Sequence, residues 1–210
     1  FQSAVGIADM FSHLTENFFS KNPDNDFSDE LIVAGLHTVL KFAPIVLQDP
    51  TNYEARGALM VLSPLAINGV TKVGRWGDWG CHDIEHEMSG EWDIPHGAGL
   101  AIVMPAWMRY VYRDWLNLFV RFANMVFHVP VNVDNPEQTA LAGIEKFSDF
   151  LFQTLGLPSS LSGLGIAPEA LTDEVLHRVA EQVFYLGGET VGRTRPLCSD
   201  DIFQILKMCV

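Results

Sequence analysis

Apolar residues recur along most of the chain at intervals of three and four, the period of a helix with one buried face. The first such stretch has Ile7, Met10, Phe11, Leu14 and Phe18 as its apolar stripe. No stretch alternates apolar and polar residues in the manner of a half-buried strand. The sequence therefore predicts an all-α fold. The expected helices are residues 4–20, 29–48, 53–70, 80–90, 96–114, 116–127, 137–155, 169–186 and 199–208.

Turn-forming residues separate these helices, and proline also occurs inside three of them. We expect Ser28 to start the second helix and Ser199 to cap the last one. Pro44, Pro64 and Pro105 stand within helical patterns, so bends supported by neighbouring helices are expected there. The clearest loops are residues 21–27, 49–52, 74–80 and 156–168.

Three of the seven histidines, His82, His86 and His96, fall within one short segment. Neutral imidazole is the commonest protein ligand for transition metals. His82 and His86 are four apart, so a helix places them on one face. Pro95 turns the chain before His96, which allows a second helix to bring His96 back toward the first. A lone histidine is more often a hydrogen-bonded structural residue, but three together favour a metal site.

Asp9 and His13 add a carboxylate and a fourth imidazole at helical spacing. As an isolated pair they would be a solvated aspartate beside an incidental histidine. With His82 and His96 they complete four oxygen and nitrogen ligands for one divalent metal ion. This donor set suits Fe²⁺, Zn²⁺, Mn²⁺ or Co²⁺ without choosing among them. A metal with an open position polarises a carbonyl or stabilises an alkoxide.

Two other interpretations compete with this one. In a zinc metallohydrolase, His82-x-x-x-His86 would supply two ligands with a carboxylate base between them. That hypothesis fits less well, because Asp83 stands where the motif has glutamate and His96 follows His86 by ten residues instead of six. In the third interpretation the chain is a non-catalytic helical interaction domain whose histidines are structural. Metal analysis and ligand substitution separate the three.

Composition limits the partners that the chain can have. The 13 basic and 26 acidic residues give a formal net charge of −13, which argues against nucleic acid or an anionic membrane surface. No apolar run approaches the length of a bilayer span and no signal-peptide order is present, so we expect a cytoplasmic protein. Three widely spaced cysteines favour reduced thiols. We expect one domain over residues 1–210, or that domain with a smaller C-terminal lobe from about residue 157.

The motifs together resemble those of the iron-containing (group III) alcohol dehydrogenases, and most closely the NADPH-dependent butanol dehydrogenase branch. The first matching element is an Asp-x-x-x-His metal element near the start of the chain. The second is a histidine-rich signature followed by an apolar helix. The matching residues are Asp9 to His13, Asp78-Trp79 followed by His82-x-x-x-His86-Glu and His96, residues 100–107 (LAIVMPAW) and residues 155–158 (LGLP).

The resemblance implies a dehydroquinate synthase-like fold, of which this chain would be the helical metal-binding domain. It implies that Asp9, His13, His82 and His96 are the metal ligands, with Fe²⁺ or Zn²⁺ bound. His86 would lie near the nicotinamide and the substrate as a catalytic proton relay. The implied reaction is hydride transfer between NAD(P)H and a small aldehyde or primary alcohol, in a homodimer.

Members of that family carry an N-terminal α/β nucleotide-binding domain before the position of Phe1. This chain opens at Phe1 without methionine and already in a helical pattern, so we expect a fragment that lacks that domain. No glycine-rich turn of the kind that holds a pyrophosphate is found in the sequence. The 210-residue chain is therefore expected to bind metal and to show negligible dehydrogenase activity alone.

Overall fold

The computed structural model describes residues 1–21, 25–184 and 187–210, and all regular structure in these residues is helical. Two isolated bridges, Ser20 to Gly77 and Val191 to Leu197, are the only strand-like pairings in the described part. The all-α prediction is therefore confirmed. The helices are α1 (Gln2–Phe18), α2 (Asp26–Gln48), α3 (Tyr53–Ile67), α4 (Gly80–Trp92), α5 (His96–Val111), α6 (Leu116–Phe127), α7 (Pro136–Asp149), α8 (Asp173–Gln182) and α9 (Ser199–Lys207). Shorter turns are the 3₁₀ helices η1 (Val70–Lys72), η3 (Ser162–Leu164) and η4 (Pro168–Ala170) and the π-helical turn η2 (Phe150–Thr154).

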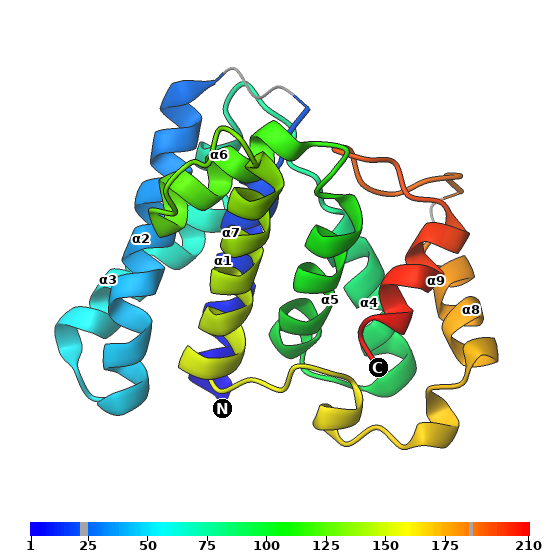
Figure 1. Cartoon of the computed structure of the whole chain (residues 1–210). Coiled ribbons are helices and arrows are strands. Elements are labelled where there is room, and N and C mark those ends of the chain that lie inside the picture. The colour runs from blue at the N-terminus through cyan, green and yellow to red at the C-terminus, as the bar shows by residue number, and fades with distance from the viewer. Residues whose placement is uncertain (22–24, 185–186) are drawn as a thin grey trace.

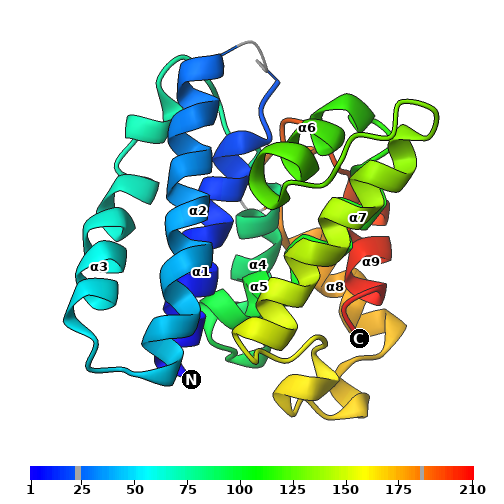
Figure 2. The ribbon, with the colours of Figure 1, turned by 60° about the vertical axis from the view of Figure 1, so that its left-hand side comes forward.

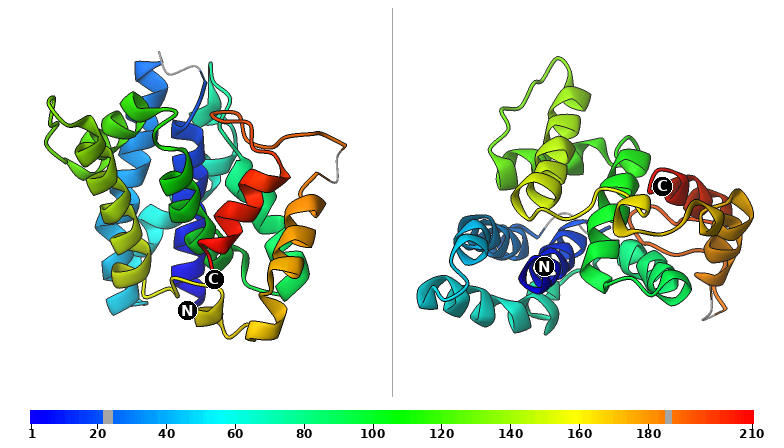
Figure 3. Two further views of the ribbon diagram at one scale, coloured as in Figure 1. Left: turned by 45° about the vertical axis from the view of Figure 1, so that its right-hand side comes forward. Right: turned by 90° about the horizontal axis from the view of Figure 1, so that it is seen from below.

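Helix α1 is the central element, and it packs against α2, α3 and α5. Seen end-on, it lies between the α2 and α3 pair and the α4 and α5 pair, with α6 and α7 on a third side (Figure 3). Helix α3 lies on the outer side of α2 (Figure 2). Helices α8 and α9 pack on each other and against α4 and α5 respectively (Figure 1). The domain boundaries, including a lobe from about residue 157, stay a prediction.

Both an apolar and a polar face of α1 are buried, because other helices surround it. On the apolar face, the ring of Phe11 lies 5.2 Å from that of Phe147 and 4.7 Å from that of Phe150. On the polar face, Asn17 is fully buried and donates to Thr71 Oγ1 at 2.9 Å. Buried polar groups need such partners. Helix α1 thus contributes both to the hydrophobic core and to a buried polar contact.

The first turn of α5 lies very close to α1 and α4. A Cβ at Gly97 would lie 2.1 Å from the backbone oxygen of Val5, and one at Gly99 would lie 2.3 Å from Glu85 Oε1. Neither distance is possible for real atoms: at Gly97 the obstacle is backbone, so this packing requires glycine there, and at Gly99 a Cβ would force the buried Glu85 side chain to move. The two glycines therefore let the first turn of α5, which carries His96, approach both neighbouring helices.

Side-chain caps move two helix starts away from the predicted positions. Helix α2 begins before the predicted Ser28, because the Asn25 side chain accepts from Ser28 N at 3.2 Å. Helix α8 begins after the predicted residue 169, because Thr172 Oγ1 accepts from Val175 N at 3.4 Å. Residues 22–24 of the predicted loop and residues 185–186 of the predicted helix end lie outside the described residues.

Several predicted helices end earlier than expected, among them α3 and α5, and one predicted helix changes its winding. Helix α3 ends at Ile67 because Gly69 takes a φ of 96°, which is left-handed. Helix α5 ends at Val111 instead of residue 114. The predicted helix 137–155 is α-helical only to Asp149 and continues as the π-helical turn, in which Leu155 N donates to Phe150 O at 2.9 Å. The three internal prolines do lie inside helices, as predicted.

Helix α2 passes a length and composition test for a membrane span, which the search for uninterrupted apolar runs did not apply. It has 23 residues and a mean hydropathy of 1.7 over its best window, which is long and apolar enough to cross a membrane. The helix contains polar and charged residues, so it is no uninterrupted apolar run, and only its mean hydropathy passes the test. A core helix passes the same test, and α2 packs against α1 and α3, with 39% of that window buried.

Replacing Gly97 with alanine should destabilise the metal-free chain. The new methyl group has no room beside the Val5 carbonyl, and overpacking of this kind costs about 1–3 kcal/mol. Gly90→Ala in α4 is the matched control, because a Cβ there meets nothing within 4 Å. The control should be neutral or gain up to about 1 kcal/mol. Urea unfolding measures both variants, and equal stabilities would contradict the close approach of α5.

Candidate metal centre

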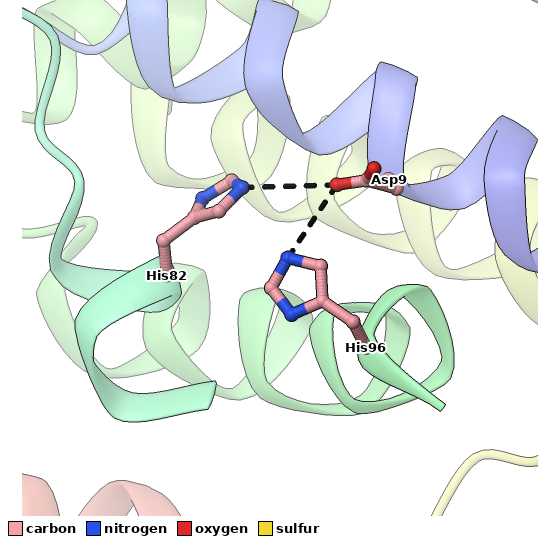
Figure 4. Close-up of side chains that lie close together, drawn as sticks. All are labelled: Asp9, His82 and His96. Carbon is pink, nitrogen blue, oxygen red and sulfur yellow. Dashed lines mark ion pairs between the residues drawn. The ribbon is translucent and has the colours of Figure 1, made fainter. Parts of the chain in front are cut away.

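Three helices bring an aspartate and two histidines to one point. Asp9 lies on α1, His82 in the first turn of α4 and His96 at the first residue of α5. Figure 4 shows both imidazoles directed at the Asp9 carboxylate. Asp9 Oδ1 lies 3.8 Å from His82 Nε2 and 3.6 Å from His96 Nε2. One donor atom from each of the three residues lies within 4.8 Å of the others, so a single ion could contact all three.

His13 lies one turn of α1 beyond Asp9 and faces the same carboxylate. Its Nε2 atom is 3.4 Å from Asp9 Oδ1, and its ring centroid is 4.3 Å from that of His82. It is not one of the three residues whose donor atoms all lie within 4.8 Å of one another. The structure therefore brings all four predicted ligands together: Asp9, His82 and His96 converge, and His13 lies beside Asp9.

His86 lies beside the cluster rather than among its converging atoms. Its exposed ring stacks on that of His96, with centroids 5.3 Å apart and an angle of 24° between the planes. The His82 ring is further away, at 6.3 Å. Partial burial and the charge of nearby His96 lower the pKa of His86. A neutral imidazole in this position can accept a proton.

A sharp turn before α4 directs its first residues toward α1. Trp79 takes a φ of 66°, in the left-handed region. Asp78 holds this turn from both sides. Its backbone N donates to Glu16 O at 2.9 Å, and its carboxylate accepts from Gly80 N at 3.1 Å and Thr194 N at 2.6 Å. The loop before α9 is thereby connected to the start of the helix that carries His82.

The Trp79 side chain forms one wall of the histidine cluster. Its ring centroid lies 5.3 Å from that of His13 and 5.1 Å from that of His82. The Lys72 ammonium group lies over the Trp79 ring, 3.9 Å from its centroid. The indole thus limits how far either imidazole can rotate. The Asp78-Trp79 pair was noticed in the sequence only through its resemblance to a family motif.

Two buried glutamates that the sequence analysis did not select lie behind the imidazoles. Glu16 Oε2 contacts His82 Nδ1, and Glu85 Oε2 contacts His96 Nδ1. Both glutamates are fully buried. An ionised carboxylate can only accept hydrogen bonds. In the neutral imidazoles, therefore, Nδ1 carries the hydrogen and Nε2 presents its lone pair toward Asp9.

The spacing of the glutamates contains a signal that could have identified them. Glu16 follows Asp9 by seven residues and His13 by three, so the three share one face of α1. Glu85 follows His82 by three residues on α4. In an acidic chain such glutamates look like part of a solvated helix face. Only the contact with a second helix shows that they are buried.

The carboxylates and imidazoles strongly influence one another's protonation. Burial lowers the pKa of His82, but interactions with Asp9 and Glu16 outweigh this effect and raise the pKa to about 9. Burial raises the pKa of Asp9, but interactions with His13 and His82 hold that pKa well below its usual range. Without a metal ion, a protonated His82 between two carboxylates therefore supplies the positive charge of the cluster.

The donor atoms fit a divalent metal ion. Buried polar atoms normally have a hydrogen-bond partner. Asp9 Oδ1 and His82 Nε2, which face each other at the cluster, are among the described buried atoms that have none. An oxygen and imidazole nitrogens converging in one partly buried place form the donor set of a divalent transition metal. A bound divalent metal ion would therefore satisfy these donor atoms, which the neighbouring side chains leave without hydrogen bonds.

Known proteins with similar sequences and structures are dehydrogenases and reductases. The chain is 38% identical over 207 residues to NADH-dependent butanol dehydrogenase A of Clostridium acetobutylicum, covering 98% of this chain and 51% of that protein. It is 29% identical over 166 residues to the NADPH-dependent aldehyde reductase YqhD of Escherichia coli, covering 79% and 42% respectively. The crystal structure of NADH-dependent butanol dehydrogenase A from Thermotoga maritima superposes with a TM-score of 0.89 at 37% identity, covering 99% of this chain and 52% of that one.

The chain spans about half the length of these relatives. A sequence profile described as Fe-containing alcohol dehydrogenase family, C-terminal, matches residues 3–210. That match extends over nearly the whole chain and includes every residue of the cluster. The protein therefore belongs to the Fe-containing alcohol dehydrogenase family, whose C-terminal part it matches.

Proposed function

We propose that Asp9, His13, His82 and His96 hold one divalent metal ion, Fe²⁺ or Zn²⁺. The chain would then be the metal-binding half of an enzyme that transfers hydride between NAD(P)H and a small aldehyde or primary alcohol. The observation that carries this proposal is the convergence of three donor atoms from three helices within 4.8 Å. Family membership supports the reaction class.

In this proposal some residues of the chain would bind the metal ion and another would transfer a proton. A divalent ion held at the cluster supplies Lewis acidity, which polarises a carbonyl oxygen or stabilises an alkoxide. Asp9 supplies the anionic oxygen that partly neutralises the ion. His86, accessible and stacked on His96, would accept the hydroxyl proton of the alcohol or return it to the aldehyde oxygen.

The proposal names the class of coenzyme but does not choose between NADH and NADPH. The motifs resemble an NADPH-dependent branch, whereas the more similar of the two relatives is named as NADH-dependent. We therefore propose NAD(P)H without a choice between them. A nucleotide-binding part in the complete gene product, a homodimer and a cytoplasmic location remain proposals.

The two competing interpretations have less support. A zinc metallohydrolase needs His82 and His86 as joint ligands, yet the converging donor atoms come from His82, His96 and Asp9. An interaction domain with purely structural histidines gives no reason for Asp9 Oδ1 and His82 Nε2 to be buried without a hydrogen-bond partner among the described residues. Each interpretation nevertheless predicts its own pattern of metal binding in substituted chains.

Removing His82 should abolish tight metal binding, whereas removing His86 should not. His82 Nε2 faces Asp9, but His86 only stacks against the cluster. Loss of a group outside the donor set typically costs roughly 10- to 100-fold in affinity, and His82→Ala should exceed that range. Chelator competition with Zn²⁺ measures both variants. Equal and near-total loss in both would favour the metallohydrolase, and parent protein without metal affinity would favour the interaction domain.

The metal-free chain should lose stability as the pH rises from 6.5 to 9. The pKa of His82 is about 9 in the folded chain, against 6.5 as its ordinary value. The folded state therefore binds more protons in this interval, and stability that is fully present below pH 6.5 is lost through pH 9. The loss is on the order of 3 kcal/mol. Urea unfolding in EDTA measures it, and His82→Gln should flatten the profile; an unchanged profile in that variant would contradict the assignment.

The complete gene product that contains this chain should reduce butyraldehyde with NADH or NADPH in a metal-dependent manner. Chelation should remove the activity, and Fe²⁺ or Zn²⁺ should restore it, because the cluster supplies the Lewis acid. Initial rates of coenzyme oxidation, followed through the absorbance of the dihydronicotinamide, measure this. Turnover that survives complete metal removal would refute the proposed function.

A further inference from the structure

We propose that Glu16 and Glu85 are positioning residues that orient two of the metal-binding imidazoles and determine how tightly the metal is held. The proposal rests on the proposed metal site and deepens it. Each glutamate contacts the Nδ1 atom of a different imidazole, on the side away from Asp9. Neither glutamate belongs to the converging donor set.

Glu16 connects α1 to the start of α4 through both of its oxygens. Oε2 contacts His82 Nδ1, and Oε1 accepts from the backbone N of Cys81 at 2.8 Å. The side chain is fully buried, so water cannot replace either contact. One carboxylate therefore fixes the His82 ring and the adjoining backbone relative to Asp9, which is seven residues earlier on the same helix.

Glu85 connects α4 to the start of α5 in a similar way. Oε2 contacts His96 Nδ1, and Oε1 accepts from Ser89 Oγ at 2.5 Å. Ser89 Oγ also lies 3.0 Å from the backbone oxygen of Ile94, in the turn before His96. Gly99 leaves the space for the carboxylate, since a Cβ there would lie 2.3 Å from Glu85 Oε1. Glu85 is thus packed on every side and holds one orientation.

These contacts act on the metal site in two ways. An accepting carboxylate on Nδ1 fixes the tautomer with a free Nε2 lone pair and orients the ring. Its negative charge also makes the imidazole a stronger donor. Among the described residues His13 has no such partner, because its Nδ1 atom is buried and has no hydrogen bond to any of them. The site therefore has two imidazoles held by carboxylates and one that is not.

Glutamine and alanine substitutions separate orientation from charge. The variants are Glu85→Gln, Glu85→Ala and Glu16→Gln. A glutamine side-chain oxygen can still accept from Nδ1 but carries no charge, whereas alanine removes both properties. Glu87→Gln is the matched control, since it removes one charge from the same helix without a contact to a ligand imidazole.

Two measurements report on the site itself rather than on the fold. Competition with a chromophoric chelator gives the affinity for Zn²⁺, and the visible absorption of bound Co²⁺ reports the coordination geometry. Far-UV circular dichroism and urea unfolding accompany each variant. Because Glu85→Ala leaves a buried cavity and can fail to fold, the two glutamine variants test the proposal independently of it.

The variants should lose different amounts of Zn²⁺ affinity. Glu85→Ala should lose affinity by roughly 10- to 100-fold and change the Co²⁺ spectrum. Glu85→Gln should keep the parent spectrum and lose roughly tenfold in affinity, while Glu87→Gln matches the parent. Glu16→Gln should lose at least as much affinity, because its amide NH2 would have to face either the backbone N–H of Cys81 or the N–H of His82. Parent-like affinity in both glutamine variants, or an equal loss in Glu87→Gln, would overturn the positioning role. A parent chain that binds no metal would instead refute the proposed function, and the positioning role with it.

Discussion

Negative charge buried where α1, α4 and α5 meet is the constraint on which this structure depends. Glu16 and Glu85 are fully buried, and Asp9 lies between their imidazole partners. A buried carboxylate is costly unless a cation or hydrogen-bond donors compensate it. The imidazoles and the hydrogen that each carries on Nδ1 are the compensation nearest to these glutamates. The three helices must therefore meet closely enough for the imidazoles to lie between the carboxylates.

The backbone around the cluster follows from this requirement. Gly97 and Gly99 allow α5 to approach α1 and Glu85 at distances that no Cβ would permit. The left-handed turn at Trp79, held by Asp78, starts α4 at the point where His82 reaches Glu16. The loop before α9 contributes Thr194 N to the same aspartate. Backbone features beside His82 and His96 in the sequence therefore help to set the positions of the two imidazoles.

Sequence periodicity predicted those features that depend on neighbours along the chain. The helical class and the pairing of Asp9 with His13 follow from spacing of three and four. Helix starts were less accurate, because Asn25 and Thr172 act through individual hydrogen bonds that periodicity does not contain. Glu16 was not selected, because its burial depends on α4, more than sixty residues later. Long-range contacts thus account for most of what the sequence alone did not reveal.

The charge of the cluster also constrains what can approach it. Three carboxylates, those of Asp9, Glu16 and Glu85, and one divalent ion would sum to −3 + 2 = −1. The whole chain, with these carboxylates included, carries a formal charge of −13. Phosphate groups would be repelled from such a place, whereas an uncharged dihydronicotinamide would not, and an oxidised, cationic nicotinamide would be attracted. In the proposed reaction the coenzyme would therefore approach this cluster with its ring, and its phosphates would need positive charge elsewhere.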